Sequence, residues 1–178
     1  MLESERNIRD EQAIDIARKM LVAARTAPKG KGVDIIECAL VTGDDAETLA
    51  REMEAIAEEK GHKFLLRDAN NIRQAQAVVL IGTRSQLMGL DCGHCGYATC
   101  AEKPQANPCA LNCIDVGIAI GSAVSRAADM RVDNRVLFSA GLAAERLGLL
   151  GKGVGHIYAI PISISSKSPF FDRPSPKA

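Results

Sequence analysis

The hydrophobic positions of this chain follow two periods, and each period predicts one kind of element. Apolar side chains recur every three to four residues in four segments, which predicts helices over residues 10–24, 46–59, 114–128 and 136–150. Short apolar runs predict strands over residues 33–41, 63–67, 77–81 and 156–160. The run at residues 77–81 has no polar position, which is typical of a strand buried on both faces.

The order of these elements predicts an α+β fold, in which helices are layered on a central sheet. Asp10 and Asp68 are predicted helix caps, and Gly61 is predicted to end the second helix. Residues 148–155 are rich in glycine but lack the lysine and the hydroxyl residue of a phosphate-binding loop. We predict a single domain over residues 1–178, with residues 91–113 inserted as a cysteine-rich loop.

Composition and charge exclude several classes of partner. The 178 residues carry equal numbers of acidic and basic side chains, and aromatic residues make up 3% of them. A neutral chain with few aromatic side chains is poorly suited to bind nucleic acid. The longest apolar runs are far shorter than the roughly 20 residues needed to cross a bilayer, and the acidic N-terminus is unlike a signal peptide. We therefore expect a cytoplasmic protein that binds neither nucleic acid nor membrane.

Five of the six cysteines lie close together, and this cluster carries the candidate chemistry. The motif Cys92-Gly-His-Cys95-Gly-Tyr-Ala-Thr-Cys100 is followed by Cys109 and Cys113. Thiolates are preferred ligands of iron–sulfur clusters and of zinc, and clustered cysteines in a reducing cytosol more often bind metal than form disulfides. Structural zinc sites usually pair two Cys-x2-Cys knuckles, and the second knuckle is missing here. The spacing favours a [4Fe–4S] cluster, with zinc as the alternative metal and thiol redox chemistry as a third interpretation.

The fourth ligand is Cys109 or Cys113, because the two are about one helical turn apart. We favour Cys109, since Pro108 beside it would help to hold the loop, whereas Cys113 begins an apolar helix. Cys38 lies in a predicted strand, where a lone cysteine behaves as a small hydrophobic residue. His94 is interpreted as a loop residue rather than a ligand.

With these motifs the chain resembles a known family. The cysteine motif, Asn-Pro-Cys109 and Ile160-Pro-Ile-Ser together are similar to prokaryotic proteins described as containing a ferredoxin domain. The similarity covers nearly the whole chain, including Phe170-Phe-Asp-Arg173. The resemblance implies that Cys113 is an extra cysteine and that the metal ligands are Cys92, Cys95, Cys100 and Cys109.

A second resemblance concerns the architecture. Ala23-Ala-Arg-Thr-Ala-Pro28 between a helix and a strand, and a later Ala/Gly-rich helix before a terminal strand, resemble the nitroreductase fold. That family forms an α+β homodimer with a central sheet flanked by helices, and it binds FMN between subunits. Its Arg-x-Ser-x-Arg phosphate motif is missing near this N-terminus, and its Pro-Ser-x-x-Asn loop is replaced by Pro28-Lys-Gly-Lys-Gly32. The resemblance leaves FMN open as a second cofactor, with its phosphate bound by Lys29, Lys31 and Arg135.

The sequence therefore predicts an iron–sulfur redox protein that transfers electrons, with a flavin as one acceptor. Its expected partners are a redox protein or a small-molecule electron acceptor, and its expected assembly is a homodimer. Two alternatives stay open: a structural zinc protein with an interaction role, and an FMN-dependent nitroreductase-like oxidoreductase. No catalytic residue is assigned, because Asp115 and Asp133 are equally well explained as helix or turn carboxylates.

Overall fold

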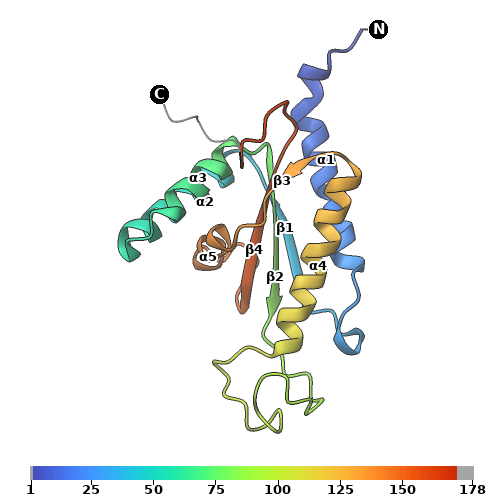
Figure 1. The fold of residues 1–178 in the computed structure, drawn as a ribbon, viewed down its shortest axis with the longest axis vertical. Coiled ribbons are helices and arrows are strands. Elements are labelled where there is room, and N and C mark those ends of the chain that lie inside the picture. The colour runs from blue at the N-terminus through green and yellow to red at the C-terminus, as the bar shows by residue number, and fades with distance from the viewer. Residues whose placement is uncertain (1, 172–178) are drawn as a thin grey trace.

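The computed structural model describes residues 2–171, and within this range four strands form one antiparallel sheet (Figure 1). The strands are β1 (Ile36–Val41), β2 (Ala77–Arg84), β3 (Asp133–Asn134) and β4 (Val154–Ser163). Their order across the sheet is β1-β2-β4-β3, and each strand runs antiparallel to its neighbours.

Helices cover both faces of this sheet. They are α1 (Glu5–Thr26), α2 (Gly43–Lys60), α3 (Phe64–Gln74), α4 (Ala110–Asp129) and α5 (Phe138–Arg146), with a short 3₁₀ turn, η1, at Gly30–Gly32. Helices α1 and α4 pack side by side on one face, and α2, α3 and α5 pack on the other (Figure 1). Over the described residues, no helix combines the length and the apolarity needed to cross a membrane.

Strand β2 is buried between the two helical layers. Its side chains alternate, so that Val78 and Leu80 pack with α2, α3 and α5, whereas Val79 and Ile81 pack with α1 and α4. This alternation explains why the run at residues 77–81 is apolar at every position. The predicted fold class, a central sheet flanked by helices, is confirmed.

Residues 63–67 begin a helix, where the sequence analysis predicts a strand. Within α3, Leu65, Ala69 and Ile72 recur at helical spacing and are fully buried. A window of five residues is too short to separate this period from that of a strand. Asp68, predicted as a cap, lies inside α3, where its carboxylate accepts a hydrogen bond from the Ser139 hydroxyl at 2.6 Å.

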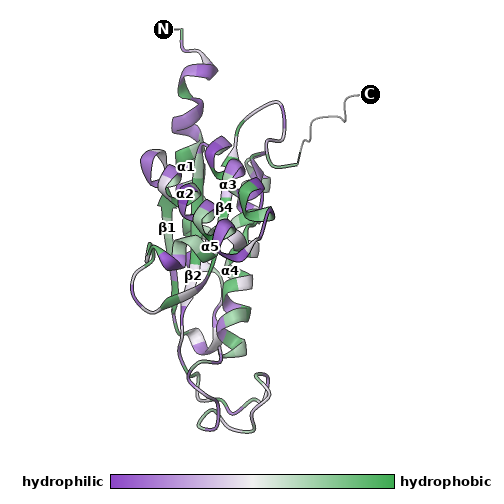
Figure 2. Cartoon of the chain, turned by 90° about the vertical axis from the view of Figure 1, so that its left-hand side faces the viewer, coloured by the Kyte–Doolittle hydropathy of each residue, from purple (hydrophilic) through white to green (hydrophobic). Residues whose placement is uncertain are grey.

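Two other predicted boundaries are also wrong. Helix α1 begins at Glu5 rather than at Asp10, and its polar first turns extend beyond the other elements (Figure 2). An ion pair between Arg9 Nη2 and Glu5 Oε2, 2.7 Å apart, stabilises these turns. The spacing of apolar residues gives no sign of it, because both side chains are charged. Strand β4 continues past its predicted end, through Pro161, whose carbonyl accepts the N–H of Arg135 at 3.4 Å.

Candidate metal centre

The cysteine loop leaves the sheet at the end of β2 and returns as α4, so it lies at one end of the molecule (Figure 1). Residues 85–109, all of them described, contain no helix or strand. The amide N–H of Gln86 donates to Asn112 Oδ1 at 2.9 Å, and Lys31 Nζ donates to the Met88 carbonyl at 2.9 Å. These contacts anchor the loop to α4 and to the segment around η1.

Four cysteines line one hollow inside this loop, called here the cysteine hollow. Cys92 is exposed, Cys95 and Cys100 are half-buried, and Cys109 is buried. Cys113 lies outside and lines a neighbouring hollow. Among residues 2–171, no three Cys, His, Asp or Glu side chains converge closely enough to bind a single metal ion. The four cysteines that the family resemblance implies as ligands thus share one lining without converging in this structure, and the fifth cysteine lies outside it.

Two glycines shape the turn that carries the first pair of cysteines. Gly93 and Gly96 have φ angles of 71° and 87°, in the left-handed region that favours glycine. The Gly96 N–H donates to the Gly93 carbonyl at 2.9 Å, which closes the turn and lets Cys92 and Cys95 line the same hollow. His94 does not line it, and its Nδ1 lies 3.0 Å from the Cys92 carbonyl oxygen.

Cys100 and Cys109 are held by different parts of the loop. The Cys100 N–H donates to the Asp91 carboxylate at 2.6 Å, which fixes the backbone at this residue. Cys109 is the N-cap residue of α4 and is 6% exposed. Because the N-terminus of a helix carries partial positive charge, this position favours a negatively charged group.

The other two cysteines are less suited to bind metal, because a metal ligand must be a thiolate. Burial raises the pKa of the Cys38 thiol to about 11, and this side chain packs against the apolar core. Burial also raises the pKa of the Cys113 thiol, and the neighbouring Cys109 adds to the effect.

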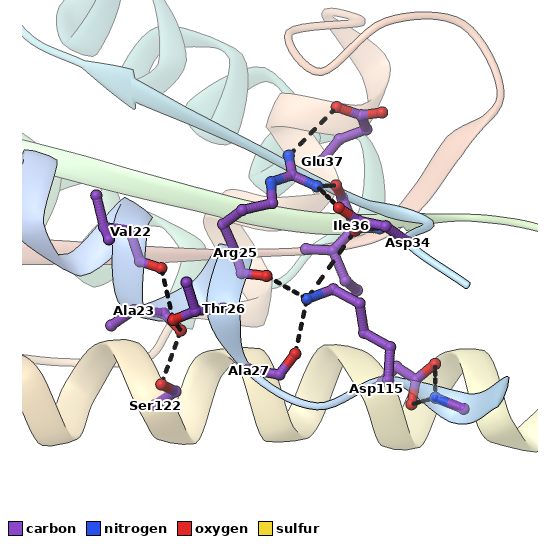
Figure 3. A network of polar contacts seen from close by, with 12 residues as sticks. Val22, Ala23, Arg25, Thr26, Ala27, Asp34, Ile36, Glu37, Asp115 and Ser122 are labelled. Atoms are coloured by element: carbon purple, nitrogen blue, oxygen red, sulfur yellow. Dashed lines mark hydrogen bonds and ion pairs between the residues drawn. The ribbon is translucent and has the colours of Figure 1, made fainter. Parts of the chain in front are cut away.

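A buried carboxylate ties the η1 segment to α4 (Figure 3). Asp115 is 3% exposed, and its two oxygens accept the N–H of Gly30 at 2.9 and 3.1 Å. About two turns of α4 further from the cysteines, the Ser122 hydroxyl donates to the Ala23 carbonyl at 2.8 Å. We interpret Asp115 as a structural clamp, since its hydrogen bonds go to the backbone of a neighbouring loop.

The three candidate phosphate ligands do not meet in one place. Lys29 Nζ donates to the Ala27 carbonyl at 2.8 Å and so closes the end of α1 (Figure 3). Lys31 is bound to the entry of the cysteine loop, as described above. Arg135 follows β3, at the other end of the sheet, where its Nη1 donates to the Phe170 carbonyl at 2.8 Å. Lys31 therefore lies beside the cysteine hollow, whose lining includes Met88, and Arg135 lies at the opposite end of the sheet.

Arg135 lines a second and larger hollow, with a volume of about 1070 Å³, which is called here the Arg135 hollow. Its lining consists of Arg67, Asn70, Asn71, Gln74, Arg135, Ser165, Lys167, Ser168, Pro169 and Phe170. Three of these residues are cationic and none is acidic. The Asn71 side chain is buried, and its Nδ2 has no hydrogen-bond partner among the described residues. The sequence pattern did not reveal this hollow, because α3 and the C-terminal segment meet only in the fold; Arg173 lies outside the described residues.

Comparison with known proteins gives the chain a family. Residues 105–173 match the family described as "Uncharacterized protein containing a ferredoxin domain (DUF2148)". A protein of Archaeoglobus fulgidus, described as "Uncharacterized protein", is 39% identical over 183 residues, which cover 97% of this chain and 98% of that protein. The chain belongs to this ferredoxin-domain family. Cys109 and Cys113 lie within the family match, and Cys92, Cys95 and Cys100 precede it.

Solved structures similar to this ferredoxin-domain protein share its fold. The nitroreductase CinD from Lactococcus lactis, in complex with nicotinic acid, has a TM-score of 0.60 at 15% identity, over 93% of this chain and 81% of that one. An oxidoreductase containing FMN has a TM-score of 0.59 at 11% identity, over 86% and 67% of the two chains. A BluB-like flavoprotein from Clostridium difficile has a TM-score of 0.55 at 18% identity, over 92% and 85%. These likenesses confirm the predicted nitroreductase-like fold.

Proposed function

We propose that this ferredoxin-domain protein is an iron–sulfur redox protein in which Cys92, Cys95, Cys100 and Cys109 bind a [4Fe–4S] cluster. The observation that carries the proposal is that these four cysteines line one hollow and Cys113 lines another. The donor set fits, because such a cluster takes four cysteine thiolates. When bound, the cluster exchanges single electrons with a redox protein or a small-molecule acceptor. The chain supplies ligation, burial and electrostatic tuning.

The test is the metal content and absorbance of protein purified and reconstituted without oxygen. We expect iron together with acid-labile sulfide, and a broad visible absorbance that bleaches on reduction. Bound zinc, with no iron taken up during reconstitution, would show that the site is the structural zinc site of the alternative hypothesis.

The two cysteines at the start of α4 give a matched pair of variants. Cys109→Ala is expected to lose the cluster, because Cys109 lines the cysteine hollow. Cys113→Ala is expected to keep it, since this thiol faces the neighbouring hollow. Iron and sulfide per chain measure both results. Loss of the cluster in Cys113→Ala alone would mean that Cys113 is the fourth ligand.

A specific observation favours a flavin as a second cofactor. The Arg135 hollow is lined by Arg135 and Lys167, by Arg67, which is ion-paired with Asp68 at 2.8 Å, and by Asn71, whose buried Nδ2 has no hydrogen-bond partner among the described residues. This donor set fits the phosphate of FMN, since guanidinium groups bind phosphate through paired hydrogen bonds. We propose the phosphate there rather than at Lys29, because Lys29 Nζ donates to two backbone carbonyls, whereas Arg135 has five N–H donors and one of them is bound to the Phe170 carbonyl.

Titration of the protein with FMN, followed by quenching of flavin fluorescence, tests this second site. Arg135→Met is expected to weaken FMN binding about 10-fold or more, because a hydrogen bond to a charged group is lost (about 1.5–3 kcal/mol). Lys60→Met, at an exposed lysine at the end of α2, is the control and should leave the affinity unchanged. Equal FMN affinities of the wild type, Arg135→Met and Lys60→Met would show that FMN does not bind in the Arg135 hollow.

Helix α4 separates the two candidate sites, since it begins directly after Cys109 and ends before β3. Its 20 residues span about 30 Å. On its outer face Ile114 and Ile118 are 46% and 40% exposed, and the nearby Gly117 and Gly121 have open space above them. We propose that this uncharged stripe pairs with that of a second copy.

An antiparallel pairing of two α4 helices about a twofold axis would set opposite ends of the two copies side by side. The cysteine loop of one copy would then approach the end of its partner that carries the Arg135 hollow. The molar mass in solution tests this assembly by light scattering. We expect the mass of a dimer, and a mass of one chain at micromolar concentration would refute the pairing.

A further inference from the structure

A buried lysine lines the cysteine hollow without an acidic partner. Lys103 is 8% exposed and shares the lining with the four cysteines. Its Nζ donates to the Pro104 carbonyl at 3.0 Å and also to the Asn107 carbonyl. In the described part of the chain its ammonium group forms no ion pair. A buried cation is therefore held here by neutral carbonyl groups alone.

Such a burial is costly unless an opposite charge compensates it. The two carbonyls satisfy two of the three N–H donors of the ammonium group, but they carry no net charge. The carboxylate that lines the same hollow, that of Asp91, is exposed and accepts the N–H of Cys100. The other groups of this lining that can carry negative charge are the four cysteines, which bind a metal centre as thiolates.

We propose that Lys103 is the counter-charge of the occupied cysteine hollow and raises the reduction potential of the centre held there. The inference rests on the proposed function. Four thiolates carry more negative charge than the core of an iron–sulfur cluster carries positive charge, and each added electron makes the centre more negative. A fixed cation beside it stabilises the reduced form more than the oxidised form, and net charge and hydrogen bonds are known determinants of cluster potentials.

The same lysine also shapes the loop. Its two carbonyl contacts close the segment between Cys100 and Cys109, and the Asn107 side-chain amide within that segment donates to the Tyr97 hydroxyl at 2.6 Å. A variant that removes both the charge and the hydrogen bonds would mix the two roles. The experiment therefore needs one substitution that keeps a donor and one that keeps the charge.

Lys103→Gln removes the charge and keeps an N–H donor, and Lys103→Arg keeps the charge. Lys60→Gln removes an exposed lysine on α2 and serves as the control. The full chain is reconstituted without oxygen, iron and sulfide are counted, and the reduction potential is read from a redox titration followed by electron paramagnetic resonance. We expect Lys103→Gln to retain iron and to shift to a more negative potential. Lys103→Arg and Lys60→Gln should keep the wild-type potential.

Each other outcome decides the question. Lys103→Gln with wild-type iron content and an unchanged or more positive potential would overturn the inference. Loss of the cluster in Lys103→Gln, with retention in Lys103→Arg, would show that the charge is needed for assembly and would support the counter-charge. Loss in both variants would assign Lys103 a purely steric role and overturn it. A wild-type protein that takes up no iron refutes the proposed function instead, before any variant is made.

Discussion

Replacing Gly141 by alanine tests the contact that holds α5 against the sheet. An added Cβ would stand 1.6 Å from the carbonyl oxygen of Ile157 and 2.5 Å from its carbonyl carbon. Both atoms belong to the backbone of β4, which is hydrogen-bonded to β2 and cannot give way alone. The whole of α5 would therefore have to move away from the sheet.

The magnitude follows from the size of this movement. Non-bonded heavy atoms are ordinarily about 3.5–4.0 Å apart, so α5 would have to shift by about 2 Å. Ala140, Ala143 and Ala144, which are fully buried on the same helix, would lose part of their packing. Overpacking of a core typically costs about 1–3 kcal/mol, and here no flexible side chain can absorb the strain. We expect a loss of about 3 kcal/mol or more, which lowers Tm by about 6–12 °C for a chain of this length.

Urea and thermal unfolding, followed by circular dichroism at one protein concentration for all variants, measure this loss. Gly121→Ala is the control for an added methyl group within one chain, because Gly121 is also helical but has nothing within 4 Å of the added Cβ. Since Gly121 lies beside the proposed dimer stripe, the molar mass of this variant is measured as well. Helix propensity predicts a gain of up to about 1 kcal/mol for the control. If Gly141→Ala unfolds within about 0.5 kcal/mol of the wild type, the close approach of α5 to β4 is incorrect.

Two further predictions concern buried ionisable groups. Asp115→Ala is expected to lower the free energy of unfolding by about 1.5–3 kcal/mol, because the Gly30 N–H loses a charged acceptor, and a loss within the error of the urea titration would contradict the clamp. The pKa of Cys38 is raised from 9.0 to about 11, so the folded state favours the neutral thiol. The stability that this provides is complete below pH 9 and is lost as the pH rises toward 11. Urea titrations across this range should show a steeper fall for the wild type than for Cys38→Ala, and equal slopes would show that the thiol does not contribute.

Sequence patterns predicted the elements whose period extends over several turns, and they failed where the decisive contact is not local. The strand at residues 77–81 could be predicted, because a strand buried on both faces has no polar position in its sequence. The helix at residues 63–67 could not be predicted from these five residues, because Ala69 and Ile72, which complete its buried face, lie further along the chain. The clamp between Asp115 and Gly30 joins residues 85 positions apart, and no local pattern marks it.

The cysteine site shows the same division between local and distant information. The spacing of Cys92, Cys95 and Cys100 is local, and the turn between the glycines brings the first two to one hollow. The choice between Cys109 and Cys113 depends on where α4 begins. The sequence places that start at residue 114, which leaves both thiols in the loop, whereas α4 starts at Ala110 and carries Cys113 toward the neighbouring hollow.

The two candidate sites lie at opposite ends of the antiparallel sheet. Strand β4 begins beside the exit to the cysteine loop, where Val154 pairs with Arg84, and it ends at Ser163, shortly before the C-terminal residues of the Arg135 hollow. Its 10 residues place the two ends about 30 Å apart, the length that α4 also spans. Within one chain the proposed cluster and a flavin would therefore be separated by the whole sheet. The proposed antiparallel dimer through α4 would set the cysteine loop of one copy beside the opposite end of its partner, whereas the Arg135 hollow is lined by α3 on the other face of the sheet. In a monomer, the cysteine loop would instead be open to an external redox partner. The molar mass in solution separates these two arrangements.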